Sequence, residues 1–178
     1  MSRKKILDCT IRFGGYLNNW NFDKKLVKDL YRYEMTDKTP KMQTSHAILM
    51  LSGKYVLQLR DDKPSISAPG EWSLFGGMLN DGEVPSEGIK REIFEELNIK
   101  PQHYRALWYM DYYLPLEKKD VRTWLFEAEV DKVWGAHKLN EGKDVKALSY
   151  HELKDIKIPD VMRKALERHH KERERING

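Results

Sequence analysis

Hydrophobic and polar positions along the middle of the chain follow two kinds of pattern. Runs rich in β-branched and aromatic residues predict strands, and they lie at residues 44–51, 54–60, 105–114 and 121–130. Ser52 and Gly53, between the first two runs, are typical of a tight hairpin. Ile89, Ile93 and Leu97 recur every four residues, which predicts a helix with one buried apolar stripe.

The first part of the chain is expected to form an appendage, with residues 1–40 separate from a main domain at 41–178. Alternation at residues 6–12 predicts a strand, and residues 23–33 predict a helix. The stretch ILDCTIRFGGYLNNWNFD also resembles the opening of aldolase and acyl-lyase TIM barrels. Phe13 stands where those barrels carry a metal-binding aspartate, so no aldolase site is expected.

The C-terminal residues 159–176 predict a last helix, whose early apolar positions dock on the core. Its end, RHHKERERI, is nearly all charged. We expect that end to be solvated, including His169 and His170, because adjacent helical residues point in different directions and share no third ligand.

The helix that carries the apolar stripe has recognisable ends. Pro85 suits the first helical position, whereas Val84 is a poor N-cap. Asn98 follows Leu97, and asparagine tolerates the left-handed conformation that closes many helices. Gly88 lies inside the helix and costs about 1 kcal/mol relative to alanine, so we expect a close neighbour at that point.

Four carboxylates and an arginine concentrate on this helix and on the loop before it, namely Glu83, Arg91, Glu92, Glu95 and Glu96. The last three glutamates share one helical face, where like charges repel unless something positive lies between them. A hard divalent cation suits that place, because Mg2+ and Mn2+ prefer oxygen ligands. Arg91 could pair with one carboxylate. The alternative is an ordinary solvated face.

Gly77, Glu83 and the run from Arg91 to Ile99 resemble the Nudix box, G-x5-E-x7-R-E-U-x-E-E-x-G-U, in which U is a bulky aliphatic residue. Only Asn98 departs from it, where the family has glycine. The resemblance implies an α/β Nudix fold, with a mixed, twisted β-sheet between α-helices. It also implies Mg2+- or Mn2+-dependent hydrolysis of a nucleoside diphosphate linked to another moiety.

Within that class a nucleotide-sugar or a nucleoside triphosphate is expected as the substrate. A Nudix-fold module that binds or senses a nucleotide without cleaving it is the alternative. By position, metal-binding roles carry over to Gly76, Glu83, Glu92, Glu95 and Glu96. Catalytic roles carry over to Arg91, Glu92, Glu95 and Glu141. Glu141 is the later-loop candidate for the general base, and its alternative reading is an ordinary turn residue.

Candidates for substrate binding are Arg60, Trp72, Gly77, Tyr112 and Arg122. The arginines suit phosphate contacts, and aromatic side chains can stack on a base. Aromatic residues also favour strands, so a place in the core is the alternative for them. Residues 61–70 and 115–120 read as loops in which the family carries substrate specificity.

Composition limits the cellular compartment and the partners that we expect for this protein. The 178 residues include 40% hydrophobic and 34% charged residues, and no apolar run approaches the roughly 20 residues that cross a bilayer. Neither a membrane partner nor a signal peptide is expected. A single cysteine, Cys9, suits a reducing cytoplasm. The net charge of +4 arises largely at the two ends of the chain, which disfavours a nucleic-acid partner. A homodimer is expected from family habit.

Overall fold

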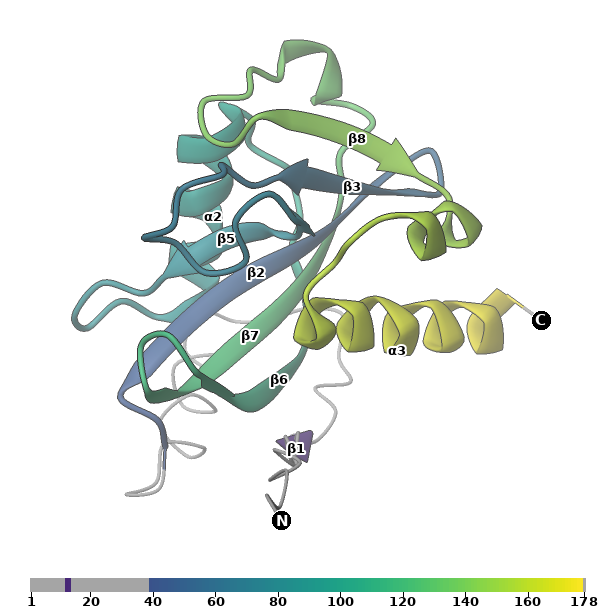
Figure 1. Cartoon of the computed structure of the whole chain (residues 1–178). Helices are drawn as coiled ribbons and strands as arrows, with labels where there is room; N and C mark the ends of the chain where they lie inside the picture. The colour runs from purple at the N-terminus through teal and green to yellow at the C-terminus, as the bar shows by residue number, and fades with distance from the viewer. Residues whose placement is uncertain (1–11, 14–38, 178) are drawn as a thin grey trace.

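The computed structural model describes residues 12–13 and 39–177 (Figure 1). Its strands are β1 (Arg12–Phe13), β2 (Met42–Leu51), β3 (Lys54–Leu59), β4 (Trp72–Ser73), β5 (Phe75–Met78), β6 (Arg105–Leu114), β7 (Lys119–Glu129) and β8 (Asp144–Leu148). Its helices are α2 (Pro85–Leu97), the 3-10 helices η1 (Trp134–Ala136) and η2 (Tyr150–Asp155), and α3 (Asp160–Asn177).

The described strands form one mixed sheet. Its order is β1-β6-β7-β2-β3-β4, while β5 pairs with β2 and β8 pairs with β3. Strands β2 and β7 run parallel, and the other pairings are antiparallel. Ser52 and Gly53 have φ angles of 49° and 77°, so both turn residues lie in the left-handed region that a two-residue hairpin favours. The predicted hairpin is confirmed.

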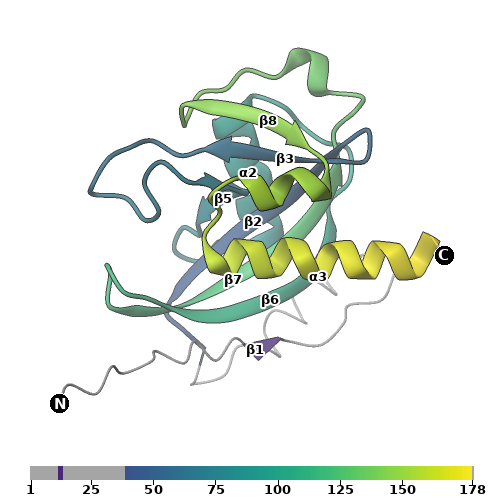
Figure 2. The same ribbon diagram turned by 45° about the vertical axis from the view of Figure 1, so that its right-hand side comes forward.

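Helices α2 and α3 cover opposite faces of the sheet (Figure 2). Successive strand residues point to opposite faces, and β2 shows the result. Ala47 and Leu49 pack with the residues of α2, whereas Ile48 and Met50 pack with those of α3. This arrangement confirms the predicted α/β fold, a mixed sheet between helices.

Helix α2 begins and ends as its sequence predicts. Val84 makes no side-chain cap, Pro85 opens the helix, and Asn98 closes it at φ 55° with its N–H donating to the carbonyl of Phe94. A Cβ atom at Gly88 would lie 2.4 Å from Leu79 Cδ2. Glycine at this position therefore allows the helix to pack against the segment that follows β5.

Helix α3 is docked further along its length than expected. His169 is only 1% exposed, and its Nδ1 lies 3.1 Å from the hydroxyl of Tyr55. The ring of His170 stacks on Tyr150 at 3.6 Å between centroids. The prediction that both histidines are solvated was wrong, because β3 and the segment before α3 supply aromatic partners distant in sequence.

The predicted strand at residues 6–12 and helix at 23–33 lie outside the described residues, apart from Arg12. So does most of the segment that resembles the opening of a TIM barrel. Arg12 and Phe13 pair with Asp111 and Met110 of β6. None of the helices in the described part of the chain combines the length and apolarity needed to cross a membrane.

Candidate active site

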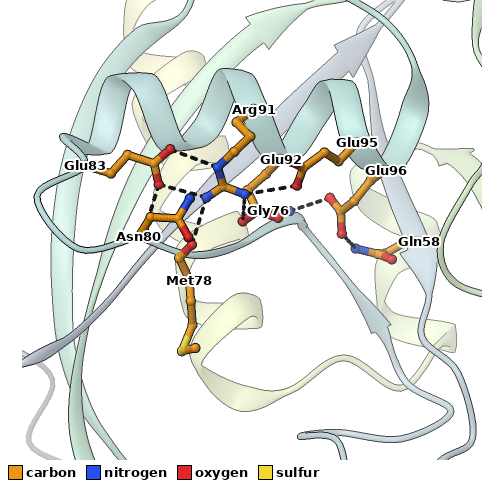
Figure 3. Close-up of polar contacts among 9 residues, drawn as sticks. All are labelled: Gln58, Gly76, Met78, Asn80, Glu83, Arg91, Glu92, Glu95 and Glu96. Atoms are coloured by element: carbon orange, nitrogen blue, oxygen red, sulfur yellow. Dashed lines mark hydrogen bonds and ion pairs between the residues drawn. The ribbon is translucent and has the colours of Figure 1, made fainter.

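Arg91 joins three of the four carboxylates (Figure 3). Its Nε and Nη2 atoms donate to the two oxygens of Glu83 at 2.9 and 2.8 Å. Its Nη1 donates to Glu92 Oε1 at 2.7 Å and to Glu95 Oε2 at 3.0 Å. Nη2 also reaches the carbonyl of Met78 at 3.0 Å. Arg91 thus ties helix α2 to the loop before it and to the end of β5.

Glu83 is the anchor of this arrangement. Its Oε2 also accepts a hydrogen bond from the main-chain N–H of Asn80 at 2.9 Å. The hydrogen bond from Arg91 is the main reason that the pKa of Glu83 lies below its ordinary value, and burial opposes it. An ionised Glu83 in turn raises the pKa of Arg91. The pair therefore stays charged and fixes the guanidinium that Glu92 and Glu95 share.

Glu96 points away from Arg91, into the sheet (Figure 3). The residue is 4% exposed, and its carboxylate accepts from Gln58 Nε2 at 3.0 Å and from the Gly76 N–H at 2.8 Å. Burial raises the pKa of Glu96 to about 8, although these two hydrogen bonds oppose the rise. Its partners are neutral amides, so no cation among residues 12–13 and 39–177 forms an ion pair with this carboxylate.

The two glycines of β5 make room for these contacts. A Cβ at Gly77 would lie 2.6 Å from Glu92 Oε2, and one at Gly76 would lie 2.1 Å from the carbonyl oxygen of Ser45. Gly76 also adopts φ 132°, which disfavours other residues. Burial raises the pKa of Glu92, and the hydrogen bond from Arg91 opposes that effect. Any side chain at Gly77 would displace the Glu92 carboxylate.

The loop before β8 docks on the C-terminal end of α2. Asn140 donates its main-chain N–H to the carbonyl of Glu96 at 2.8 Å and its Nδ2 to that of Glu95 at 2.9 Å. These carbonyls have no partner within the helix. The adjacent Glu141 is exposed, and its charge contributes to the raised pKa of Glu92 and of Glu96. The loop therefore brings Glu141 to the same end of the site.

Sequence reasoning missed Gln58 and Asn140. Gln58 is 2% exposed and interrupts an apolar strand, KYVLQL. A polar residue in such a run is a usable signal, because a buried amide needs partners. Asn140 gave a weaker signal, since an asparagine in a loop is common.

A divalent cation fits this site by the chemistry of its donors. The carboxylates of Glu92, Glu95 and Glu96 and the carbonyl of Gly76 are hard oxygen ligands of the kind that Mg2+ prefers. Within residues 12–13 and 39–177, no three His, Cys, Asp or Glu side chains already surround one point. Arg91 instead balances two of the carboxylates, so cation binding would require these side chains to reorient.

The predicted substrate-binding residues lie in four different settings, of which that of Arg122 is described last. Gly77 lies against Glu92, as described above. Arg60 donates Nε to the carbonyl of Ser67 at 2.8 Å, and its charge acts on Tyr112, whose pKa burial raises to about 12. Trp72 is 8% exposed and belongs to the core on the α3 face. Its ring therefore lies apart from the carboxylates of α2.

Arg122 is also apart from those carboxylates. It is 5% exposed and pairs with Asp111 at 2.7 and 2.9 Å. Its guanidinium lies 3.8 Å from the centre of the Tyr109 ring. The contacts of Arg122 therefore join β6 to β7.

Comparisons with known proteins agree with this fold and motif. A family model described as the NUDIX domain matches residues 41–169. The 8-oxo-dGTP diphosphatase of Escherichia coli (strain K12) is 33% identical over 60 residues, which are 34% of this chain and 46% of that protein. The match thus spans about half the length of this curated relative.

Two solved structures share the fold at lower identity. The MutT protein from Methanosarcina mazei Go1 is 24% identical with a TM-score of 0.65, covering 78% of this chain and 99% of that one. The NUDIX domain of Shewanella oneidensis NrtR, complexed with ADP ribose, is 17% identical with a TM-score of 0.63, covering 82% and 97%. Because the family model spans most of the described residues, this chain belongs to the NUDIX domain family.

Proposed function

We propose that this chain is a Mg2+-dependent pyrophosphohydrolase that cleaves a nucleoside diphosphate linked to another moiety. One observation carries the proposal: Glu92, Glu95 and Glu96 leave one helix beside the Gly76-Gly77 strand, where separate hydrogen bonds hold each carboxylate. A solvated glutamate face would not need a half-buried arginine or a buried glutamine to hold its members. Mn2+ is the second choice of cation.

A nucleoside triphosphate is the first choice of substrate, ahead of a nucleotide-sugar. The support is the name of the E. coli relative, which acts on 8-oxo-dGTP. Among nucleotides the shared chemistry is a pyrophosphate next to a nucleoside.

Different residues of this chain would bind the cation, orient its ligands and accept a proton. Glu92, Glu95, Glu96 and the carbonyl of Gly76 would hold the cation. When bound, the cation offsets the pyrophosphate charge and lowers the pKa of a water molecule. Arg91 orients Glu92 and Glu95 through Nη1.

Gln58 and the N–H of Gly76 orient Glu96 in the same way. Glu141 is placed by the Asn140 contacts, where its exposed carboxylate can accept a proton from the attacking water.

The test is product identification by mass spectrometry. The protein is incubated with Mg2+ and a pool of nucleoside triphosphates and nucleotide-sugars, beside Glu96→Gln and the control Glu87→Gln. Glu87 is exposed in the first turn of the same helix. We expect one compound to lose its pyrophosphate linkage, with Glu96→Gln slower by about 100-fold or more and Glu87→Gln unchanged.

Two other results would change the conclusion. Equal turnover by Glu96→Gln and the unaltered protein would remove the carboxylates of α2 from the mechanism. No turnover with Mg2+ or Mn2+, together with a nucleotide that raises the melting temperature, would favour a binding module that does not cleave its ligand.

A further inference from the structure

Two segments that flank the sheet are joined by a short hydrogen bond. Ser67 Oγ, in the loop at residues 61–70, donates to Oε1 of Glu117 at 2.6 Å. Glu117 lies in the turn between β6 and β7, 50 residues further along the chain. The base of the loop is closed by the Arg60 N–H, which donates to the carbonyl of Glu71 at 3.0 Å. The contact therefore holds two otherwise independent loops together.

The other oxygen of Glu117 has no such partner. Oε2 is buried and accepts no hydrogen bond from any residue in the described ranges. A buried polar atom without a partner costs about 1–3 kcal/mol, and such atoms are rare enough that each needs an explanation. An ionised carboxylate can only accept hydrogen bonds. Oε2 of Glu117 is thus an acceptor that a ligand could satisfy by entering between the two loops.

The neighbours of Glu117 are polar groups of the kind found in a recognition site. The charges of Glu117 and Arg60 act in opposite directions on the pKa of Tyr112. Arg60 also donates Nε to the carbonyl of Ser67, so it holds the loop that contacts Glu117. We call Arg60, Ser67, Tyr112 and Glu117 the loop cluster.

The loop cluster is linked to the carboxylates of α2 through β3. Arg60 directly follows this strand, two residues after Gln58. Gln58 donates Nε2 to Glu96 at 3.0 Å. A ligand held by the loop cluster could therefore extend past the end of β3 toward the carboxylates.

We propose that Glu117 is a specificity-determining residue that selects guanine nucleotides, an inference that rests on the proposed function. Guanine presents two adjacent donors, N1–H and N2–H, to an acceptor-only carboxylate. Adenine and cytosine each place a ring nitrogen acceptor beside their amino group. The N3–H of thymine lies between two carbonyl oxygens. Each of these three bases would face Glu117 with at least one repelling lone pair.

The test measures binding of deoxynucleoside monophosphates by isothermal titration calorimetry with Mg2+ present. A monophosphate has no pyrophosphate bond to cleave, so recognition is measured apart from turnover. We expect the unaltered protein to bind dGMP at least about 10-fold more tightly than dAMP, since one bidentate base contact discriminates by about 1–3 kcal/mol.

Glu117→Gln supplies the sharpest comparison. The amide keeps an acceptor for Ser67 and replaces one acceptor with a donor, and glutamine pairs with adenine through both groups. We expect the preference for dGMP to fall by at least about 10-fold, or to turn toward dAMP. Asp120→Asn is the matched control. It removes one carboxylate from an exposed position of the same hairpin and should leave the preference unchanged.

The proposal is overturned if the unaltered protein binds dGMP and dAMP equally or binds neither. It is also overturned if Glu117→Gln keeps the preference for dGMP, or if Asp120→Asn removes that preference equally. A clear preference for dGMP that depends on Glu117, in a protein that hydrolyses nothing, would support the recognition site and remove the hydrolase proposal. The two failures are therefore distinguishable.

Discussion

Glu96 and Glu127 are the same residue type at similar burial on opposite faces of the sheet, yet their acidities shift in opposite directions. Glu96 is 4% exposed and Glu127 is 8% exposed. The pKa of Glu96 rises to about 8, and that of Glu127 falls to about 2. Burial alone raises the pKa of both groups, so their partners account for the difference.

The partners differ in charge. Glu127 contacts Arg105 and His169, and Arg173 Nη1 donates to its Oε1 at 2.7 Å. In the part of the chain that the structure describes, Glu96 has only the neutral donors of Gln58 and Gly76. The carboxylate on the α3 face is thus compensated by the protein itself. The carboxylate of Glu96 has no charged partner among the described residues, and buried acids of this kind are candidates for ligand binding.

Replacing each carboxylate with a neutral amide should give the largest effects. It should separate the structural role of Glu127 from the proposed cation-binding role of Glu96. Glu127→Gln is expected to lower the free energy of unfolding by about 2 kcal/mol, because Arg105 loses its ion pair with Glu127 and Arg173 keeps its pair with Glu129 alone. Turnover should stay within about twofold, since Glu127 contacts none of the proposed cation ligands. Urea unfolding and steady-state kinetics measure the two quantities.

Glu96→Gln supplies the contrast. Its unfolding free energy should change by no more than about 1 kcal/mol, because burial already favours the neutral form of the Glu96 carboxyl and the amide is neutral too. A Glu96→Gln protein less stable than Glu127→Gln would contradict this account of the two faces.

The free energy of unfolding at acid pH should depend on the protonation of Glu127. Its pKa is about 2 in the folded protein and 4.5 ordinarily, so between these values the unfolded chain binds more protons. The stabilisation from Glu127 is therefore complete above about pH 5 and is lost as the pH falls toward 2. Urea unfolding from pH 6 to pH 3 measures it, with Glu127→Gln as the reference.

Other carboxylates titrate in the same range, so the difference between the two proteins is the relevant quantity. That difference should shrink as the pH falls. A constant difference across the range would show that the ion pairs of Glu127 do not set its acidity.

The sequence predicts best those features that local rules determine. The ends of α2 depend on Pro85 and Asn98, whose backbone preferences act within a few residues. Gly76 and Gly77 signalled a close approach, and any side chain there would collide with Ser45 or Glu92. The spacing of the box also placed Glu92 and Glu95 beside Arg91. A homodimer, a cytoplasmic location and the role of residues 1–40 stay predictions.

Partners that are distant in sequence could not be predicted. Gln58 and Glu96 are 38 residues apart, and Tyr55 and His169 are 114 apart. The charged C-terminal end of α3 was predicted to be solvated, because its own sequence does not show that the sheet supplies Tyr55 and Glu127 as partners. For the same reason the pattern supplied the four acids of the site but not the different environment of each one.

Tyr55→Phe should give the smallest effect of these changes. It removes the hydroxyl that contacts His169, which in turn lies beside Glu127. Burial raises the pKa of Tyr55, and its hydroxyl lies 3.1 Å from His169 Nδ1. The other ring nitrogen of His169, Nε2, lies 3.4 Å from Glu127. Removing the hydroxyl should cost about 1 kcal/mol of unfolding free energy, since the aromatic ring and its edge contact with His169 remain.

Kinetic constants should not change, because the hydroxyl lies on the α3 face. The 40% exposed Tyr113 provides the control, and Tyr113→Phe should leave stability unchanged. A loss of turnover in Tyr55→Phe at unaltered stability would mean that the two faces of the sheet are coupled. In that case Glu127 would help to position the active site as well as to hold α3 on the sheet.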